Sequence, residues 1–173
     1  RWIAYFSDAT DEYELYVTQS DGLGRTIQIT KPGDAPNKFR LGLSWSPDSK
    51  MLFFVDKGGD GYLVTLGESD GQGGLKAGST KHVDTNPWGE PFGVSWSSDS
   101  KWLAYVKQEP GSGQHAIWLY NIPKGEAHKV TSGFFNDDNP TFDRKGDYLF
   151  FSSSRTFNPR YSELDTTFIY SGT

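Results

Sequence analysis

One short module recurs along this chain: an aromatic residue, a tight polar turn, and then a run of apolar residues. The aromatic-and-turn runs are WSPDSK at 45–50, WSSDSK at 96–101 and FDRKGD at 142–147. The apolar runs that follow them are MLFFV at 51–55, WLAYV at 102–106 and YLFF at 148–151. The first six residues, RWIAYF, match the second half of the same module. The module therefore occurs four times, once without its first half.

A repeat spaced by about 45 to 50 residues, with this aromatic and turn pattern, is typical of β-propeller blades. We expect an all-β fold, a partial β-propeller of four-stranded antiparallel blades, about three and a half blades long. The chain is then a single propeller segment over 1–173. Its blade units are about 1–40, 41–90, 91–138 and 139–173.

Each unit is expected to supply up to four short strands. The first strand ends on the aromatic residue, and the second is the apolar run, buried on both faces. The fourth is short and polar, which suits an outer edge. The expected first strands are 41–45, 93–96 and 140–142; the third strands are 14–18, 62–66 and 117–122; the fourth strands are 26–30, 81–83 and 128–131. No segment keeps a helical period, so we expect almost no helix.

The first and last units both contain the second strand, so the two chain ends do not complement each other within one blade. We therefore expect an open segment of a larger ring, with two sheet faces whose apolar side chains a neighbouring blade would cover. Two copies of this half-ring could also associate through those faces, which would make a homo-oligomer.

Composition excludes several function classes. The formal net charge is −5, and the lysines and arginines are scattered, without the basic stripe that nucleic-acid binding requires. No apolar run reaches about 18 residues, so no membrane span is expected. The chain has no Cys, which removes disulfides and thiolate metal sites. We expect no cofactor.

The sequence offers no catalytic constellation. It has three histidines, His82, His115 and His128, and no G-x-S-x-G turn of the kind that presents a nucleophilic serine. We interpret His82 and His128, in the expected outer strands, as surface residues and expect no catalytic residue in the chain. The acidic residues at 137–138 and 56–60 lack the alternating oxygen ligands of a calcium loop, so we expect no metal site at either. Residues 56–61 are interpreted as a hairpin connection between the second and third strands.

Two aspartates and several tryptophans are interpreted as structural. Asp48 and Asp99 can accept hydrogen bonds from backbone N–H groups of their own turns. We expect the tryptophans that begin or follow the turns to fill the space between blades; these are Trp2, Trp45, Trp96 and Trp102. Tyr13, Trp88 and Trp118 are aromatic residues that could face solvent.

The turn Ser-Pro-Asp-Ser-Lys after Trp45 resembles the WD40-like PD40 repeat of the TolB and tricorn propellers. The second copy keeps the pattern except that Ser98 replaces the proline, and the third copy keeps only its aromatic residue, a glycine and the general shape. The stretch from Phe135 to Asp165 resembles the closing blade of the second propeller in tricorn-type serine proteases of the S41 clan. In that family the catalytic residues lie outside the propellers.

That resemblance implies a non-catalytic propeller segment of a tricorn-like serine peptidase, helping to form a substrate-access channel or an interaction surface for oligopeptides. Its partners would be the remaining blades and the downstream peptidase domains of the parent chain, in the cytoplasm. The alternative is a TolB-like propeller scaffold that binds a protein partner without peptidase activity, in the periplasm.

The connection after the last apolar run breaks the repeat, and such loops often carry function. Its polar side chains are candidates for contact with a peptide or a partner: Arg155, Asn158, Arg160 and Tyr161. An arginine pair beside a tyrosine could bind a peptide carboxylate or an acidic side chain. The other interpretation is that this loop docks onto the next domain or wraps the edge of its own blade.

Overall fold

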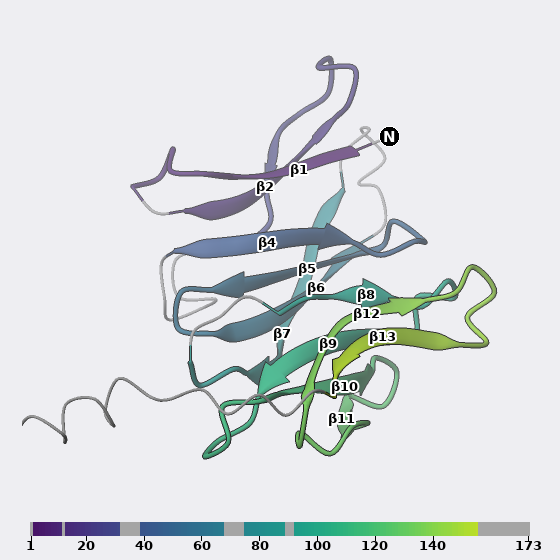
Figure 1. Ribbon diagram of the computed structural model, residues 1–173. Helices are drawn as coiled ribbons and strands as arrows, with labels where there is room; N and C mark the ends of the chain where they lie inside the picture. Colours follow the sequence, from purple (N-terminus) through teal and green to yellow (C-terminus); the bar gives the residue numbers. More distant parts are fainter. Residues whose placement is uncertain (1, 12, 32–38, 68–74, 89–91, 156–173) are drawn as a thin grey trace, which may run out of the picture.

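The computed structural model describes residues 2–11, 13–31, 39–67, 75–88 and 92–155. Every regular element in these ranges is a β-strand, and no helix occurs among them. The strands form four antiparallel sheets that follow one another along the chain (Figure 1). The predicted all-β architecture of a partial propeller is confirmed.

The four sheets follow the repeat, with one sheet for each copy of the module. The first sheet holds β1 (Trp2–Ser7), β2 (Glu14–Gln19) and β3 (Ile27–Gln28). The second holds β4 (Arg40–Trp45), β5 (Met51–Asp56), β6 (Asp60–Gly67) and β7 (Lys76–Thr85). The third holds β8 (Ser95–Trp96), β9 (Trp102–Gln108), β10 (His115–Asn121) and β11 (Glu126–Lys129). The fourth pairs β12 (Asn136–Phe142) with β13 (Leu149–Ser154).

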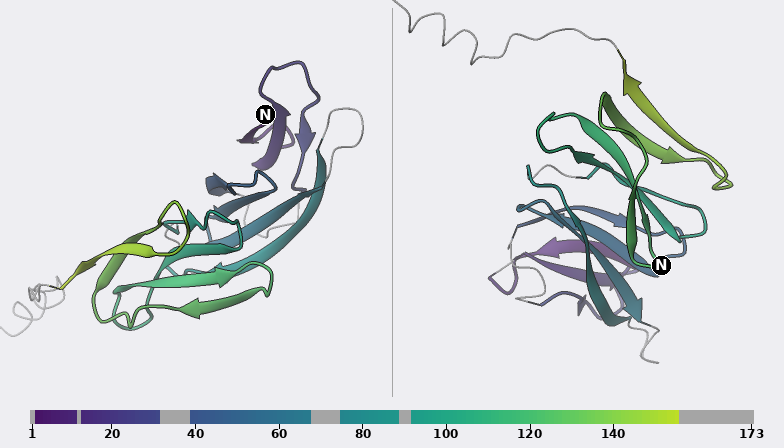
Figure 2. Two further views of the ribbon diagram at one scale, coloured as in Figure 1. Left: turned by 90° about the vertical axis from the view of Figure 1, so that its right-hand side faces the viewer. Right: turned by 90° about the horizontal axis from the view of Figure 1, so that it is seen from below.

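Within the second and third sheets, consecutive strands pair as neighbours, from the first strand of the unit to the fourth. The two further views show the sheets fanned against one another rather than lying in one plane (Figure 2). One outer strand differs from expectation. β7 is ten residues long, not short, and pairs with β6 along almost its whole length through two register irregularities.

The apolar run of β5 buries both of its faces, because the second sheet lies between the first and the third. The expectation fails for the corresponding run of β13, which is largely exposed. Leu52 and Phe54 of β5 pack with Leu15 and Val17 of the first sheet. Phe53, which alternates with them along the strand, faces the third sheet. Two hydrophobic cores therefore lie between sheets, and β5 contributes to both.

The expectation for the tryptophans is only partly met. Trp2, Trp45 and Trp96 are half-buried and pack against the edges of these cores, while Trp102 is half-buried and belongs to neither cluster. The fully buried large side chains are instead those of tyrosine, phenylalanine and leucine on the second and third strands. The indole of Trp96 reaches across the sheet boundary, where its Nε1 donates to Ser44 Oγ at 3.0 Å.

The outermost sheets leave apolar side chains exposed, as the sequence predicted. In β1, Trp2, Ala4 and Phe6 pack on the core, while Ile3 and Tyr5 alternate to the open face. In β13, Phe150 is 61% exposed. The large exposed side chains of β1 and β13 are thus aromatic and aliphatic, like the side chains buried between neighbouring sheets.

A candidate ligand pocket between the last two sheets

The turn of the repeat has one geometry in all three copies. It sets where the first strand of a unit ends and where the second begins. In the first copy, the N–H of Ser49 donates to the Ser46 carbonyl at 2.9 Å, and the N–H of Ser46 donates to the Met51 carbonyl at 2.9 Å. The fourth turn position is left-handed in each copy: φ is 60° at Ser49, 59° at Ser100 and 79° at Gly146. The pattern is a type I turn closed by a left-handed residue.

Asp48 and Asp99 lie inside these turns and make the same contacts. Asp48 Oδ1 accepts from Ser46 Oγ at 2.6 Å and from the Lys50 N–H at 3.0 Å. The corresponding distances at Asp99 are 2.7 and 3.1 Å. The Ser97 hydroxyl, and then the Lys101 N–H, lower the pKa of Asp99 because both hydrogen bonds favour the ionised carboxylate. The geometry supports a structural role for both aspartates.

The third copy reaches the same shape with different residues. It has Asp143 where the first copy has Ser46, and Asp143 Oδ1 accepts from the Tyr148 N–H at 2.9 Å. Ser46 Oγ accepts from the Met51 N–H at the same distance. A carboxylate at the first turn position therefore replaces a hydroxyl, which explains how the weakest match to the repeat still folds as a copy of it.

Two of the histidines are structural or solvent-facing. His82 on β7 and His128 on β11 are each about half exposed, with side-chain accessibilities of 49% and 56%. Nε2 of His82 contacts both Asp60 Oδ1, at 3.0 Å, and Thr85 Oγ1, at 3.2 Å. Because one nitrogen makes both contacts, Asp60 cannot orient the ring while the other nitrogen activates Thr85, so these three residues do not form a catalytic triad.

His115 is placed differently, because it lies at the junction of the third and fourth sheets. Its Nδ1 is 2.6 Å from Asp138 Oδ1, and its backbone N–H donates to Asn136 Oδ1 at 3.1 Å. His115 begins β10, whereas Asp138 lies in β12 of the next unit. The two units are thus joined at this point through a histidine–carboxylate contact.

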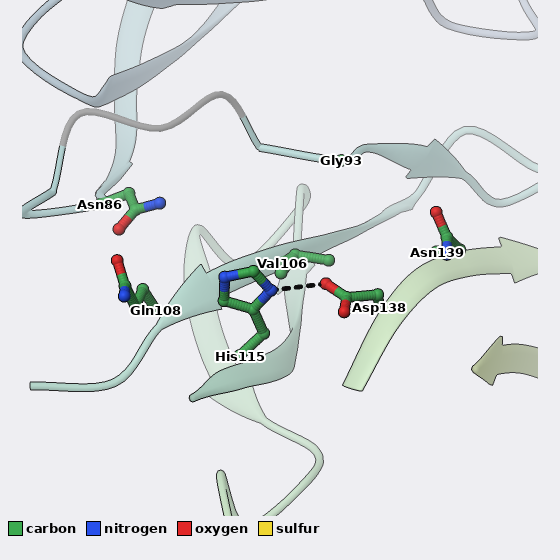
Figure 3. Close-up of a pocket in the computed structure, with 7 residues that line it drawn as sticks. All are labelled: Asn86, Gly93, Val106, Gln108, His115, Asp138 and Asn139. Carbon is green, nitrogen blue, oxygen red and sulfur yellow. Dashed lines mark hydrogen bonds and ion pairs between the residues drawn. The ribbon is translucent and has the colours of Figure 1, made fainter. Parts of the chain in front are cut away.

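These two residues line a pocket of about 200 Å³ (Figure 3). Its other polar walls are three carboxamides, from Asn86 after β7, Gln108 at the end of β9 and Asn139 in β12. Gly93 and Val106 supply its apolar wall. The close-up shows the His115 ring between the carboxamides of Asn86 and Gln108 on one side and Asp138 on the other (Figure 3).

A bulge in β12 places Asn139 at this pocket. The register of β12 against β13 shifts between Asp138 and Thr141, and Asn139 adopts a left-handed backbone with φ of 56°. The first strand of the second unit has the same irregularity, with Gly42 at φ of 63°. Bulges of this kind redirect a side chain out of the pleat. Asn139 thus carries a polar group at a repeat position that is glycine in the second unit.

None of the residues that line the pocket is serine or threonine. The pocket therefore offers hydrogen-bonding and charged groups but no hydroxyl group from its lining residues. Among the described residues, no group of three or more His, Cys, Asp or Glu side chains is arranged to hold a metal ion. Nor does the described part of the chain contain a helix long and apolar enough to cross a membrane.

Arg155, the one predicted contact residue within the described ranges, does not line this pocket. Arg155 lies at the end of β13, with its guanidinium 5.1 Å from the centre of the Phe135 ring. Asn158, Arg160 and Tyr161 lie outside the described residues. Sequence analysis did not predict the pocket either, because its polar residues are spread over 86–139 and come together only when consecutive blades pack.

Comparison with known proteins gives a consistent result. Tricorn protease homolog 1 of Streptomyces coelicolor is 26% identical over 172 residues, which covers 97% of this chain and 15% of that protein. The tricorn protease of Thermoplasma volcanium is 25% identical over 173 residues, covering 95% of this chain and 16% of that protein. The crystal structure of the tricorn protease matches 94% of this chain with a TM-score of 0.74 at 14% identity.

This chain is a propeller segment similar to those of tricorn proteases. It spans about one sixth of the length of these relatives. TolB from Acinetobacter baumannii shares the fold more distantly, with a TM-score of 0.57 over 89% of this chain at 19% identity. No protein-family profile matches the chain.

Proposed function

We propose that this chain is a non-catalytic propeller segment of a tricorn-like serine peptidase and helps to form a substrate-access channel or an interaction surface for oligopeptides. The observation that carries the proposal is sequence similarity to tricorn proteases along almost the whole chain. The pocket between the last two sheets, whose lining is polar and contains no serine or threonine, supports a role in recognition.

Stacked blades perform this role through geometry. Two hydrophobic cores between sheets hold the first three units together. Hydrogen bonds that join β12 of the fourth unit to β8 and β10 of the third hold these two units together. A rigid wall of this kind selects by size and by the charge of its rim. It admits an extended peptide and excludes a folded protein, without any catalytic residue in the blade.

The partners under this proposal are the remaining blades and the downstream peptidase domains of the parent chain, in the cytoplasm. The open faces of the first and fourth sheets support contact with further blades, because their exposed side chains are apolar. We retain Arg155, Asn158, Arg160 and Tyr161 as proposed contacts for a peptide carboxylate or a partner. Arg155 is the one of these four that the structure describes.

The test is a peptidase assay on the complete gene product that contains this chain. We expect it to hydrolyse internally quenched oligopeptides and to leave a stably folded protein of the same composition intact. Covalent labelling by a serine-directed reagent should map outside residues 1–173.

A complete product that hydrolyses no peptide and takes up no serine-directed label would contradict the proposal. If that product instead formed a stoichiometric complex with another protein, the TolB-like scaffold would be the better account. A label within 1–173 would contradict the non-catalytic role.

A further inference from the structure

We propose that the pocket between the third and fourth sheets binds the free amino terminus of an oligopeptide, with Asp138 as the counter-ion of the ammonium group. This inference rests on the proposed function, because it names the part of the peptide that the propeller segment recognises. Two observations carry it: the Asp138 carboxylate that the His115 contact holds at the pocket wall, and the chemistry of the carboxamides around it.

Asp138 keeps an oxygen available for a ligand. Within the described part of the chain, the hydrogen bond to its side chain uses Oδ1, which faces His115. Oδ2 accepts none there, and the side chain is 38% exposed at the wall of the pocket. A carboxylate has about four lone-pair sites, so one contact to an imidazole leaves acceptor capacity for an ammonium group.

His115 holds this carboxylate in place. A hydrogen bond from Nδ1 fixes the rotamer of Asp138 and the orientation of the ring. Among the described residues that line the pocket, Asp138 is the one carboxylate and none is a lysine or an arginine, so the site attracts a cation and repels a carboxylate. The carboxyl terminus of a peptide is therefore the disfavoured end.

The carboxamides match the next part of the ligand. Asn and Gln side chains present both a carbonyl acceptor and an N–H₂ donor, which is the pattern of a peptide group. Gln108 and Asn139 lie on opposite walls of the pocket (Figure 3). Gln108 Nε2 donates to the Gly113 carbonyl at 3.0 Å and Asn139 Nδ2 donates to Ser152 Oγ at 3.1 Å, so each side chain offers the first peptide bond its carbonyl oxygen and its second N–H. Asp138 thus pairs with the ammonium group of the peptide, and the carboxamides hydrogen-bond to the peptide bond that follows it.

The size of the pocket limits what enters. At about 200 Å³ it lies below the usual range of about 300 to 1,000 Å³ for small-molecule sites. A pocket of this size accommodates the terminal residue of a peptide rather than several residues. The rest of the ligand would extend along the inner strands.

The experiment measures peptide binding to the complete gene product by fluorescence anisotropy. The probe is tetra-alanine with a fluorescein-labelled lysine amide at its carboxyl end, compared with the same peptide after amino-terminal acetylation. We expect acetylation to weaken binding about tenfold or more, since a hydrogen-bonded charge is lost. Acetyl-tetra-alanine with a free carboxylate should not compete.

Two variants locate the effect. Asp138→Asn should weaken binding of the free-amine peptide about tenfold and leave the acetylated peptide unchanged. Gln108→Glu adds a second carboxylate to the pocket wall and should tighten binding of the free-amine peptide severalfold. The matched control is Asp60→Asn, because Asp60 also faces a histidine, 3.0 Å from His82, but lies on β6 of the second sheet and does not line the pocket. It should leave both affinities unchanged.

Equal binding of the two peptides, or a free-amine affinity that neither Asp138→Asn nor Gln108→Glu changes, would overturn the inference. Gln108→Glu decides the matter if Asp138→Asn fails to fold, because a gain in affinity requires a folded site. Peptide hydrolysis by the same preparations separates the two proposals. Hydrolysis without selective binding refutes only this inference, whereas selective binding without hydrolysis refutes only the peptidase assignment.

Discussion

The junction of the first two sheets contains a fully buried ion pair whose loss should be costly. Arg40 begins β4 and Glu14 begins β2, and their side chains are 1% and 0% exposed. Nη1 of Arg40 donates to Glu14 Oε2, to Thr30 Oγ1 at 2.9 Å and to the Tyr13 carbonyl at 2.6 Å. The guanidinium also lies 5.5 Å from the centre of the Phe54 ring. One arginine therefore ties the first sheet to the second.

The substitution Arg40→Met removes the cation and leaves the Glu14 carboxylate buried without its charge partner. Breaking one side of a buried pair costs about 3–5 kcal/mol. The pair is incompletely satisfied, since Glu14 Oε1 and Arg40 Nε are buried without a hydrogen-bond partner in the described structure. Replacing both residues by apolar ones should thus cost much less. We expect Glu14→Leu with Arg40→Met to lie within about 1 kcal/mol of the native chain.

Amide hydrogen exchange, read by mass spectrometry, measures the free energy of local opening in each segment. It does not require the whole protein to unfold in one step. In Arg40→Met, peptides from β2 and β4 should exchange about 100-fold faster, which corresponds to roughly 3 kcal/mol. The double variant should restore most of the protection. Arg144→Met, at an exposed turn position, is the control and should leave exchange unchanged.

An exchange rate in Arg40→Met within threefold of the native rate would refute the reasoning. So would a double variant as unprotected as the single one, because the cost would then arise from lost packing rather than from an uncompensated charge.

Three further predictions concern the turns and one buried tyrosine. Asp48→Ala removes the acceptor for the Lys50 N–H and should cost about 1 kcal/mol, so an unchanged melting temperature would count against the assignment. Ser49→Gly relieves a left-handed backbone and should stabilise by about 0.5 kcal/mol in urea unfolding; a loss of stability would contradict this. Burial, and then the Asp84 charge, raise the pKa of Tyr105. The folded state therefore holds this proton more tightly than the unfolded state, and stability should fall as pH rises above about 10. In Tyr105→Phe the melting temperature should fall less steeply with rising alkaline pH than in the native chain. An equally steep fall would contradict the raised pKa of Tyr105.

The repeat predicted the architecture well because the module encodes both the turn and the strand that follows it. Aromatic and aliphatic residues at consecutive positions, as in 51–55, are typical of a strand covered on both faces, and β5 is such a strand. The length of the outer strand β7 was not predicted. Its residues 76–80 are polar, small or charged and have no strand pattern, and their pairing with β6 comes from the neighbouring backbone rather than from their own preference.

The candidate site could not be predicted for a different reason. His115 and Asp138 are 23 positions apart and belong to different modules, so no local spacing joins them. One partial signal exists: Asn139 occupies the repeat position of Gly42, and a side chain there projects from a bulge. Glu14 and Arg40 likewise read as ordinary surface charges in the sequence, and only the packing of two sheets buries them.

The central claim is that these sheets are successive blades of a ring in a tricorn-like peptidase. The measurement that tests it most directly is an electron cryo-microscopy structure of the complete gene product. The account predicts four consecutive blade units from 1–173, with the open faces of β1 and β13 covered by further blades and the catalytic serine elsewhere in the chain. A structure in which these faces contact a domain other than a propeller, or in which the four sheets do not surround a common axis, would contradict it.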